Sequence, residues 1–233
     1  MDLKQVTDIL NSYIRPQTFP LALKLCKSES ELPERVTVPM RDLGYQITLC
    51  QGYGIARRFR WVVAVGKEDQ CCVGGASTMG FVAERPNEQL AKRLETGKYS
   101  HLLIAPTELA DFEPDLILLY TNSAQAMRLV QSAIRGADGS VSAIATGAGD
   151  CGDIVARTAN SNQCQFILPS GGDRNFGGAQ DHELIFTIPW SKVEAVMTGL
   201  EQTHRGGFRY PILSDLRHPP ALPPAMQITR DTH

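Results

Sequence analysis

Several patterns that would point directly to a class of protein are missing from this sequence. No apolar run approaches the roughly 20 residues that a membrane-spanning helix needs. The N-terminal segment, MDLKQVTDIL, carries acidic residues and no apolar leader. The formal net charge of −2 gives no reason to expect nucleic acid or an anionic membrane as a partner. We therefore expect a cytoplasmic protein.

Cysteine pairs with two-residue spacing are also missing, which removes the usual signal of a zinc ribbon or a thioredoxin-like site. The chain nevertheless has six cysteines: Cys26, Cys50, Cys71, Cys72, Cys151 and Cys164. In a reducing compartment such residues are thiols, metal ligands or catalysts rather than a disulfide framework. Any one of them, taken alone, could equally be a small buried apolar residue.

Apolar runs alternate with segments of helical periodicity along the whole chain. The runs predict strands at 21–27, 60–66, 101–106, 114–121, 139–146, 165–169 and 183–189. The helical spacing predicts helices at 3–14, 45–58, 87–97, 124–135, 149–160 and 192–204, with Ser191 as a cap of the last. Because no low-complexity linker divides the chain, we expect one compact domain over 1–233. Its fold class is α/β or α+β, with a central mixed sheet.

Two segments about 100 residues apart follow the same order. CQGYGIAR begins at Cys50 and CGDIVAR begins at Cys151, and each ends in Ala-Arg on a predicted helix. Each is followed by a strand and then by a small residue with Gly-Gly, at Cys72 and at Ser170. This order suggests two pseudo-symmetric halves, at about 40–136 and 140–207, whose facing cysteines would converge. The alternative is two ordinary strand–helix units built by the same capping rules.

Several long motifs resemble a known family. They are LCQGYGIARR, the CVGG of Cys72 to Gly75, FEPDLILLYTNSAQAMRLVQSAI, LPSGGDRNFGGAQDHELIFTIP and GLEQTHRGGFRYPI. They resemble, over nearly the whole chain, a bacterial and archaeal domain-of-unknown-function family catalogued as number one-six-nine. The resemblance implies cysteines matching Cys50, Cys72 and Cys151. It also implies a fourth cysteine where this chain has Ser170.

Converging thiolates from distant positions can hold an iron–sulfur cluster or a structural zinc ion. We favour the cluster, because the close-spaced ligand pairs typical of zinc are missing. Cys50, Cys72 and Cys151 would be ligands, and Ser170 would take the fourth corner. Cys164 is a poor substitute, since a regular strand would place it about 20 Å from Ser170. The expected role is redox chemistry or substrate binding.

A metal-free module that binds a small molecule or an anion is the main alternative. Gly171 and Gly172 allow close backbone approach to a ligand, and Arg174 adds a bidentate donor. Arg57 and Arg157 could balance the charge of a cluster or bind the same anionic ligand. The plainer interpretation of the loop is a turn that Asp173 and Arg174 hold in place, and it is slightly favoured.

A thiol enzyme is the third possibility. Cys151 lies near a predicted helix start, where its pKa would fall, and His182 could serve as its base. The sequence does not identify a catalytic residue or a substrate. A homodimer is the expectation for a soluble protein of this type.

Overall fold

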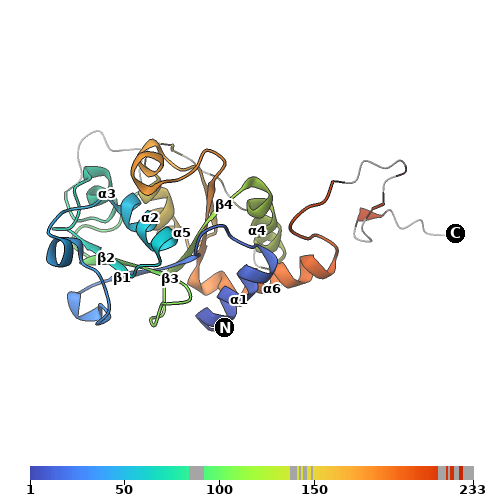
Figure 1. The fold of residues 1–233 in the computed structure, drawn as a ribbon, viewed down its shortest axis with the longest axis horizontal. Helices are drawn as coiled ribbons and strands as arrows, with labels where there is room; N and C mark the ends of the chain where they lie inside the picture. The colour runs from blue at the N-terminus through green and yellow to red at the C-terminus, as the bar shows by residue number, and fades with distance from the viewer. Residues whose placement is uncertain are drawn as a thin grey trace.

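A six-stranded sheet forms the centre of the protein, as the computed structural model in Figure 1 shows. The structure describes residues 1–83, 92–136, 141, 143, 146–147, 149–214, 219, 221–222 and 226–227. The strand order is β2-β3-β1-β4-β6-β5, and each neighbouring pair is antiparallel. The strands are β1 (Leu21–Cys26), β2 (Val63–Gly66), β3 (His101–Pro106), β4 (Leu116–Thr121), β5 (Gln165–Ile167) and β6 (Leu184–Pro189).

Helices cover both faces of this sheet, which makes the chain one compact α/β domain (Figure 1). One face carries α1 (Leu3–Tyr13), α4 (Ser123–Gly136) and α6 (Trp190–Arg205). The other carries α2 (Leu49–Phe59), α3 (Val73–Thr78) and α5 (Thr158–Ser161). Short helical segments complete the fold: η1 (Glu29–Glu31), η2 (Pro39–Leu43), η3 (Gly152–Arg157) and η4 (Asp173–Gly177).

Strand β4 shows how the two layers are built. All six of its residues are buried, as its continuous apolar run predicts. Leu118 and Tyr120 belong to the core on the α2 side, whereas Ile117 and Leu119 belong to the core beneath α4 and α6. Successive side chains of a strand point to opposite faces, so one apolar strand supplies both cores.

The strand order has the same pattern on each side of the central β1–β4 pair. β1, β3 and β2 follow outward on one side, and β4, β6 and β5 follow on the other. In each half a cysteine-bearing helical segment precedes the edge strand, and a short helical segment follows it. The two groups of strands span residues 21–106 and 116–189, whereas the predicted halves at 40–136 and 140–207 leave out β1 and place β4 in the first half. The arrangement brings α2 and the segment around Cys151 together above the same face of the sheet.

Capping residues fix several helix starts. The side chains of Asp2 and Thr48 each accept a hydrogen bond from the backbone N–H three residues on. In return, the side chains of Gln5 and Gln51 accept from the backbone N–H groups of Asp2 and Thr48. Asn122 makes the same reciprocal pair with Gln125 at the start of α4. The predicted Ser191 cap is wrong, because α6 begins after Pro189 and the Ser191 hydroxyl donates to Asn162 instead.

Other differences from the sequence expectations concern strand direction and helix geometry. The expected mixed sheet is antiparallel in all its named pairs, and among the described residues parallel pairing is limited to two isolated bridges. The helix predicted at 149–160 divides into the wider turns of η3 and the short α5. The predicted helix at 87–97 and strand at 139–146 lie partly outside the described residues. Within those described residues, no helix is long and apolar enough to cross a membrane.

Candidate metal centre

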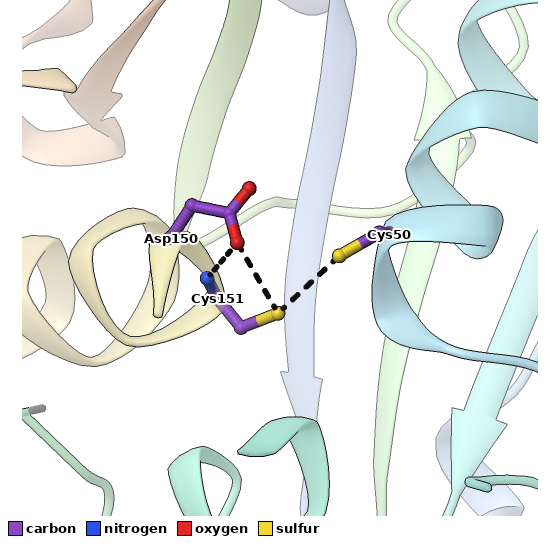
Figure 2. A group of neighbouring side chains, drawn as sticks. All are labelled: Cys50, Asp150 and Cys151. Carbon is purple, nitrogen blue, oxygen red and sulfur yellow. Dashed lines mark hydrogen bonds between the residues drawn. The ribbon is translucent and has the colours of Figure 1, made fainter. Parts of the chain in front are cut away.

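Two cysteines from the two halves meet above the sheet (Figure 2). Cys50 lies in the first turn of α2, and Cys151 lies 101 positions later, directly before η3. Their Sγ atoms are 3.8 Å apart, and both residues are buried. Both are free thiols. The position of Cys50 depends on the Thr48 cap, because that cap sets where α2 begins.

Asp150 completes a compact group with this cysteine pair. Its Oδ1 accepts from the backbone N–H of Cys151 at 3.1 Å and lies 3.9 Å from the Cys151 Sγ (Figure 2). One ligand atom from each of Cys50, Asp150 and Cys151 falls within 4.8 Å of the others. Asp150 is 2 % exposed. The structure therefore adds a buried carboxylate that the sequence interpretation missed.

A second layer of polar groups holds Asp150 in place. The Ser170 hydroxyl donates to Asp150 Oδ1 at 2.8 Å and accepts from the backbone N–H of Asp173 at 3.3 Å. Tyr120 Oη donates to Asp173 Oδ2 at 2.9 Å. Ser170 thus lies beside the cysteine pair, but its hydroxyl group is already engaged in the hydrogen bond that holds the Asp150 carboxyl group in place.

Two glycines allow the close approach between α2 and η4. A Cβ on Gly54 would lie 2.6 Å from the backbone oxygen of Gly177. A Cβ on Gly177 would lie 2.7 Å from the backbone oxygen of Cys50 and would also meet Asp173 Oδ1. No side chain larger than hydrogen fits at either position without moving backbone. The tight contact is what brings Asp173 close to the cysteines.

The cluster is strongly acidic. The pKa of Cys151 lies well above its usual value. The causes are the hydrogen bond of Cys151 with Cys50, its burial, and the charges of Cys50 and Asp150. Burial raises the pKa of Asp150, although bonds from Ser170 oppose the shift. Burial and the neighbouring Asp150 raise the pKa of Asp173 to about 7. Among the described residues, no lysine or arginine forms an ion pair with Asp150 or Asp173.

Comparison with known proteins shows the family of this chain. The DUF169 family model, described as "Uncharacterised ArCR", matches residues 9–199. The chain belongs to the DUF169 family. A curated relative, "Uncharacterized protein MJ0308" of Methanocaldococcus jannaschii, is 25% identical over 205 residues, or 78% of this chain and 86% of the relative. No solved structure matches the chain.

The remaining cysteines of this DUF169 protein differ in position. Cys72 caps α3, is partly exposed, and contributes to the raised pKa of Cys151, so it lies near the pair but outside the tight group. Cys71 is exposed. Cys164 belongs to the core on the opposite face of the sheet, beneath α4 and α6. It therefore does not take the place of Ser170.

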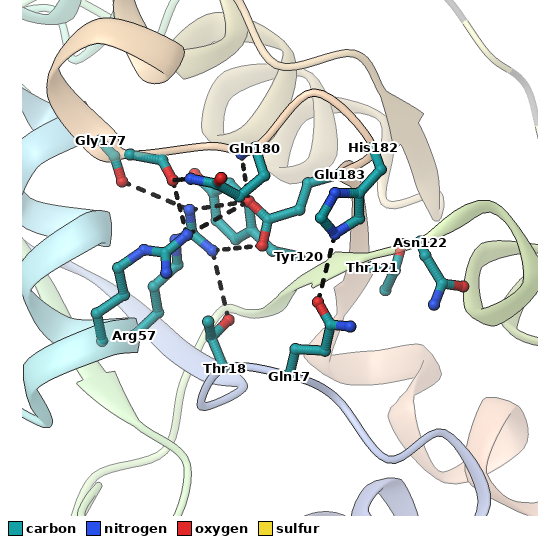
Figure 3. A network of polar contacts seen from close by, with 12 residues as sticks. Gln17, Thr18, Arg57, Tyr120, Thr121, Asn122, Gly177, Gln180, His182 and Glu183 are labelled. Atoms are coloured by element: carbon teal, nitrogen blue, oxygen red, sulfur yellow. Dashed lines mark hydrogen bonds and ion pairs between the residues drawn. The ribbon is translucent and has the colours of Figure 1, made fainter.

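Arg57 takes part in a separate buried network (Figure 3). Its guanidinium donates to both carboxylate oxygens of Glu183, at 2.8 and 3.1 Å, and lies 3.7 Å from the centre of the Tyr120 ring. Arg57 is fully buried and Glu183 is 4 % exposed. Burial is the largest single influence on the pKa of Glu183 and raises it. The hydrogen bonds from Arg57 and from the backbone of Gln180, together with the charges of Arg57 and Arg58, outweigh burial and lower that pKa.

The other predicted ligand-binding residues have partners within the protein. Arg157 donates to Asp153, four residues earlier, at 3.1 and 3.2 Å. Arg174 donates to the backbone oxygen of Gln180 at 2.8 Å, and its Nη1 lies 3.6 Å from Asp181. The Arg174 contacts hold the glycine-rich loop in place, as the plainer interpretation of that loop expected.

Two further sequence features have plain structural positions. Gly171 and Gly172 adopt no positive φ, and the left-handed residue of their loop is Gly178. His182 is exposed and pairs with Gln17 at 3.4 Å, as Figure 3 shows, whereas Cys151 is buried beside Cys50. No described histidine belongs to the group around Cys151.

Residues 147–152 also spell G-x-G-x-x-G, the glycine spacing of dinucleotide-binding turns. That function requires a parallel strand–helix–strand unit, in which the turn follows one strand and opens a helix. Here the named strand pairs are antiparallel, and the turn carries Asp150 and Cys151 into the acidic cluster. The spacing alone does not support nucleotide binding.

Proposed function

We propose that this protein is a cysteine-ligated metal-binding protein whose ion is held by Cys50, Cys151 and Asp150. One observation carries the proposal, namely the 3.8 Å between the two Sγ atoms. Tetrahedral ligands at a metal–sulfur distance of about 2.3 Å lie about 3.8 Å apart. A carboxylate oxygen at about 2.1 Å from the same ion would lie about 3.6 Å from each sulfur. The 3.9 Å between Cys151 Sγ and Asp150 Oδ1 is close to that value.

The charge of the cluster supports the same function. Two thiols and a carboxyl group are buried together, and no cation among the described residues pairs with Asp150. Burial without a counter-ion disfavours the charged form of a carboxyl group, and this raises the pKa of Asp150. A divalent cation would replace those protons and stabilise all three charges at once.

The donor set favours zinc or iron as the ion. Thiolate ligands select these metals over calcium and magnesium, which take oxygen ligands. A cluster in which each cysteine binds its own iron would require the two sulfurs to separate. An iron–sulfur centre with both cysteines on one iron keeps the observed spacing. Cys72 and Ser170 would serve its second iron only if Ser170 released its hydrogen bond to Asp150. Acid-labile sulfide distinguishes this form from a single ion.

An anion-binding function for the glycine-rich loop receives less support. Arg57, Arg157 and Arg174 each have a carboxylate partner within the protein. Binding an anionic ligand would require one of these pairs to break. The homodimer stays a prediction, which a mass measurement in solution would test.

Metal and sulfide analysis of protein purified without oxygen tests the proposal. The wild type and Cys164→Ala should each carry about one equivalent of zinc or iron, or iron with sulfide for a cluster. Cys50→Ala and Cys151→Ala should carry none. Cys164 is the matched control, because it is buried like the other two but lies on the opposite face of the sheet. Metal that is missing from the wild type, or retained in both site variants, would refute the proposal.

A further inference from the structure

Two buried polar atoms beside the cysteine pair have no hydrogen-bond partner among the described residues. They are the hydroxyl oxygen of Tyr53 and the Oδ1 of Asp173. Both side chains are fully buried. Buried polar groups in proteins are almost always paired, so an unpaired donor and an unpaired acceptor in one small region call for an explanation.

Tyr53 lies on the same side of α2 as Cys50. The two residues are three positions apart, a spacing that places helical side chains on one face. The charges that act on the Tyr53 phenol are those of the acidic cluster and of its neighbour Asp173. The cluster members are Cys151, Cys50 and Asp150. Burial and these charges hold the pKa of Tyr53 well above its usual value, so the phenol keeps its proton and is a donor.

Asp173 offers the complementary group. Its Oδ2 accepts from Tyr120, its backbone N–H donates to Ser170, and its carboxyl group shares a hydrogen bond with that of Asp150. These contacts fix the side chain, while no N–H or O–H group of the described residues donates to Oδ1. An open donor and an open acceptor in one cluster fit a ligand that both accepts and donates a hydrogen bond. A hydroxyl group has both properties, since it offers one proton and two lone pairs.

Charge narrows the choice of ligand further. Two thiolates and the Asp150 carboxylate already exceed the charge of a divalent ion by one. Arg57, whose charge acts on Asp173, is held by Glu183. An additional anion would be repelled, whereas an uncharged ligand would not.

We propose that the metal ion of this site keeps one exchangeable coordination position, filled by water or another small uncharged hydroxyl compound. The ligand accepts a hydrogen bond from Tyr53 and donates one to Asp173. This inference rests on the proposed metal-binding function and deepens it. Structural zinc sites are closed by four protein ligands, whereas sites with an open position polarise a bound substrate or water. With an exchangeable position, this metal centre would be able to polarise a bound molecule and would not be purely structural.

Cobalt substitution tests the two proposals separately. A sulfur-to-cobalt charge-transfer band at one equivalent of Co²⁺ reports the metal site itself. Broadening of the cobalt EPR signal in water enriched in oxygen-17 reports an exchangeable water on the ion. We expect both signals in the wild type. A charge-transfer band without broadening would overturn the open position and leave the metal site intact, whereas a missing band would overturn both.

Imidazole is the probe for Tyr53, because its metal-bound nitrogen has no second lone pair to accept from the phenol. Tyr53→Phe should keep its Co²⁺ affinity but bind imidazole about fivefold more tightly, since the displaced water no longer gains a hydrogen bond from residue 53. Tyr99→Phe, which changes a tyrosine of a separate surface cavity, should match the wild type. Equal imidazole affinity in the wild type and Tyr53→Phe would contradict the assignment.

Discussion

Two buried ionic clusters lie close together in this protein, and they differ in how their charges are satisfied. The Arg57–Glu183 pair has one cation, one carboxylate and two direct hydrogen bonds. The cluster of Cys50, Asp150 and Cys151 has acidic groups only, and the pKa values of Cys151 and Asp150 are raised. A cluster that is neutral by itself serves the fold, whereas one that needs a cation from outside is suited to binding it. Four experiments test this difference between the two clusters.

Glu183→Gln should have the largest effect on stability. It leaves the fully buried Arg57 without its counter-ion, and breaking a buried pair in this way costs about 3–5 kcal/mol. Urea unfolding of the metal-free protein measures the change. Glu108→Gln is the control, because it removes an exposed partner of Arg60 and should cost less than about 1 kcal/mol. Equal losses in the two variants would contradict a structural role for the buried pair.

Stability of the metal-free protein should fall between about pH 4 and pH 7 because of Asp173. Its pKa of about 7 in the folded state exceeds the usual value, so the folded state binds more protons and is favoured at low pH. The stabilising contribution is complete below the unfolded pKa and is lost as pH rises through 7. It amounts to at most about 4 kcal/mol.

Asp173→Asn isolates this contribution. The variant cannot titrate at position 173, so its unfolding free energy relative to the wild type should increase from pH 5 to pH 8. Urea unfolding at both pH values provides the comparison. A difference between the two proteins that does not change with pH would show that Asp173 is ionised throughout.

Added zinc should stabilise the wild type by about 2.7 kcal/mol when its free concentration is 100 times the dissociation constant. The reason is that the ion binds the folded acidic cluster and supplies the charge that it lacks. Cys151→Ala should show no such gain, whereas Cys164→Ala should respond like the wild type. Thermal unfolding with and without zinc measures the effect. An equal gain in Cys151→Ala would place the binding elsewhere.

Gly54→Ala should produce a smaller loss, of about 1–3 kcal/mol, together with weaker metal binding. The new methyl group would meet the backbone of Gly177 and move α2 away from η4. Gly171→Ala is the matched control, because no atom lies within 4 Å of its added carbon. It should change stability by no more than about 0.5 kcal/mol. Urea unfolding and a cobalt titration of both variants test the prediction.

The sequence identified the elements that its local patterns encode. The apolar run of β4 and the helical periodicity of α1 and α4 follow from side-chain patterns within a few residues. The comparison of the two cysteine segments led to Cys50 and Cys151, which do lie together. Strand pairing was harder, because an antiparallel or parallel arrangement depends on connections across the whole chain.

Asp150 and Arg57 show what local patterns could not reveal. Asp150 looks like an ordinary residue at a helix start, and its role depends on Ser170, 20 positions later. Its place directly before a predicted cysteine ligand was the one available signal. Arg57 was predicted to meet a cluster or an anion, but Glu183, 126 positions away, pairs with it. Such partners become visible only when the chain is folded.

A cobalt titration of the metal-free protein tests whether Cys50 and Cys151 hold one metal ion together. We expect a thiolate-to-cobalt charge-transfer band that saturates at one equivalent in the wild type. At one equivalent of cobalt the band should be missing in Cys50→Ala and in Cys151→Ala, and it should stay unchanged in Cys164→Ala. A wild-type protein that binds no cobalt through sulfur, or a band that is the same in all four proteins, would contradict this shared site.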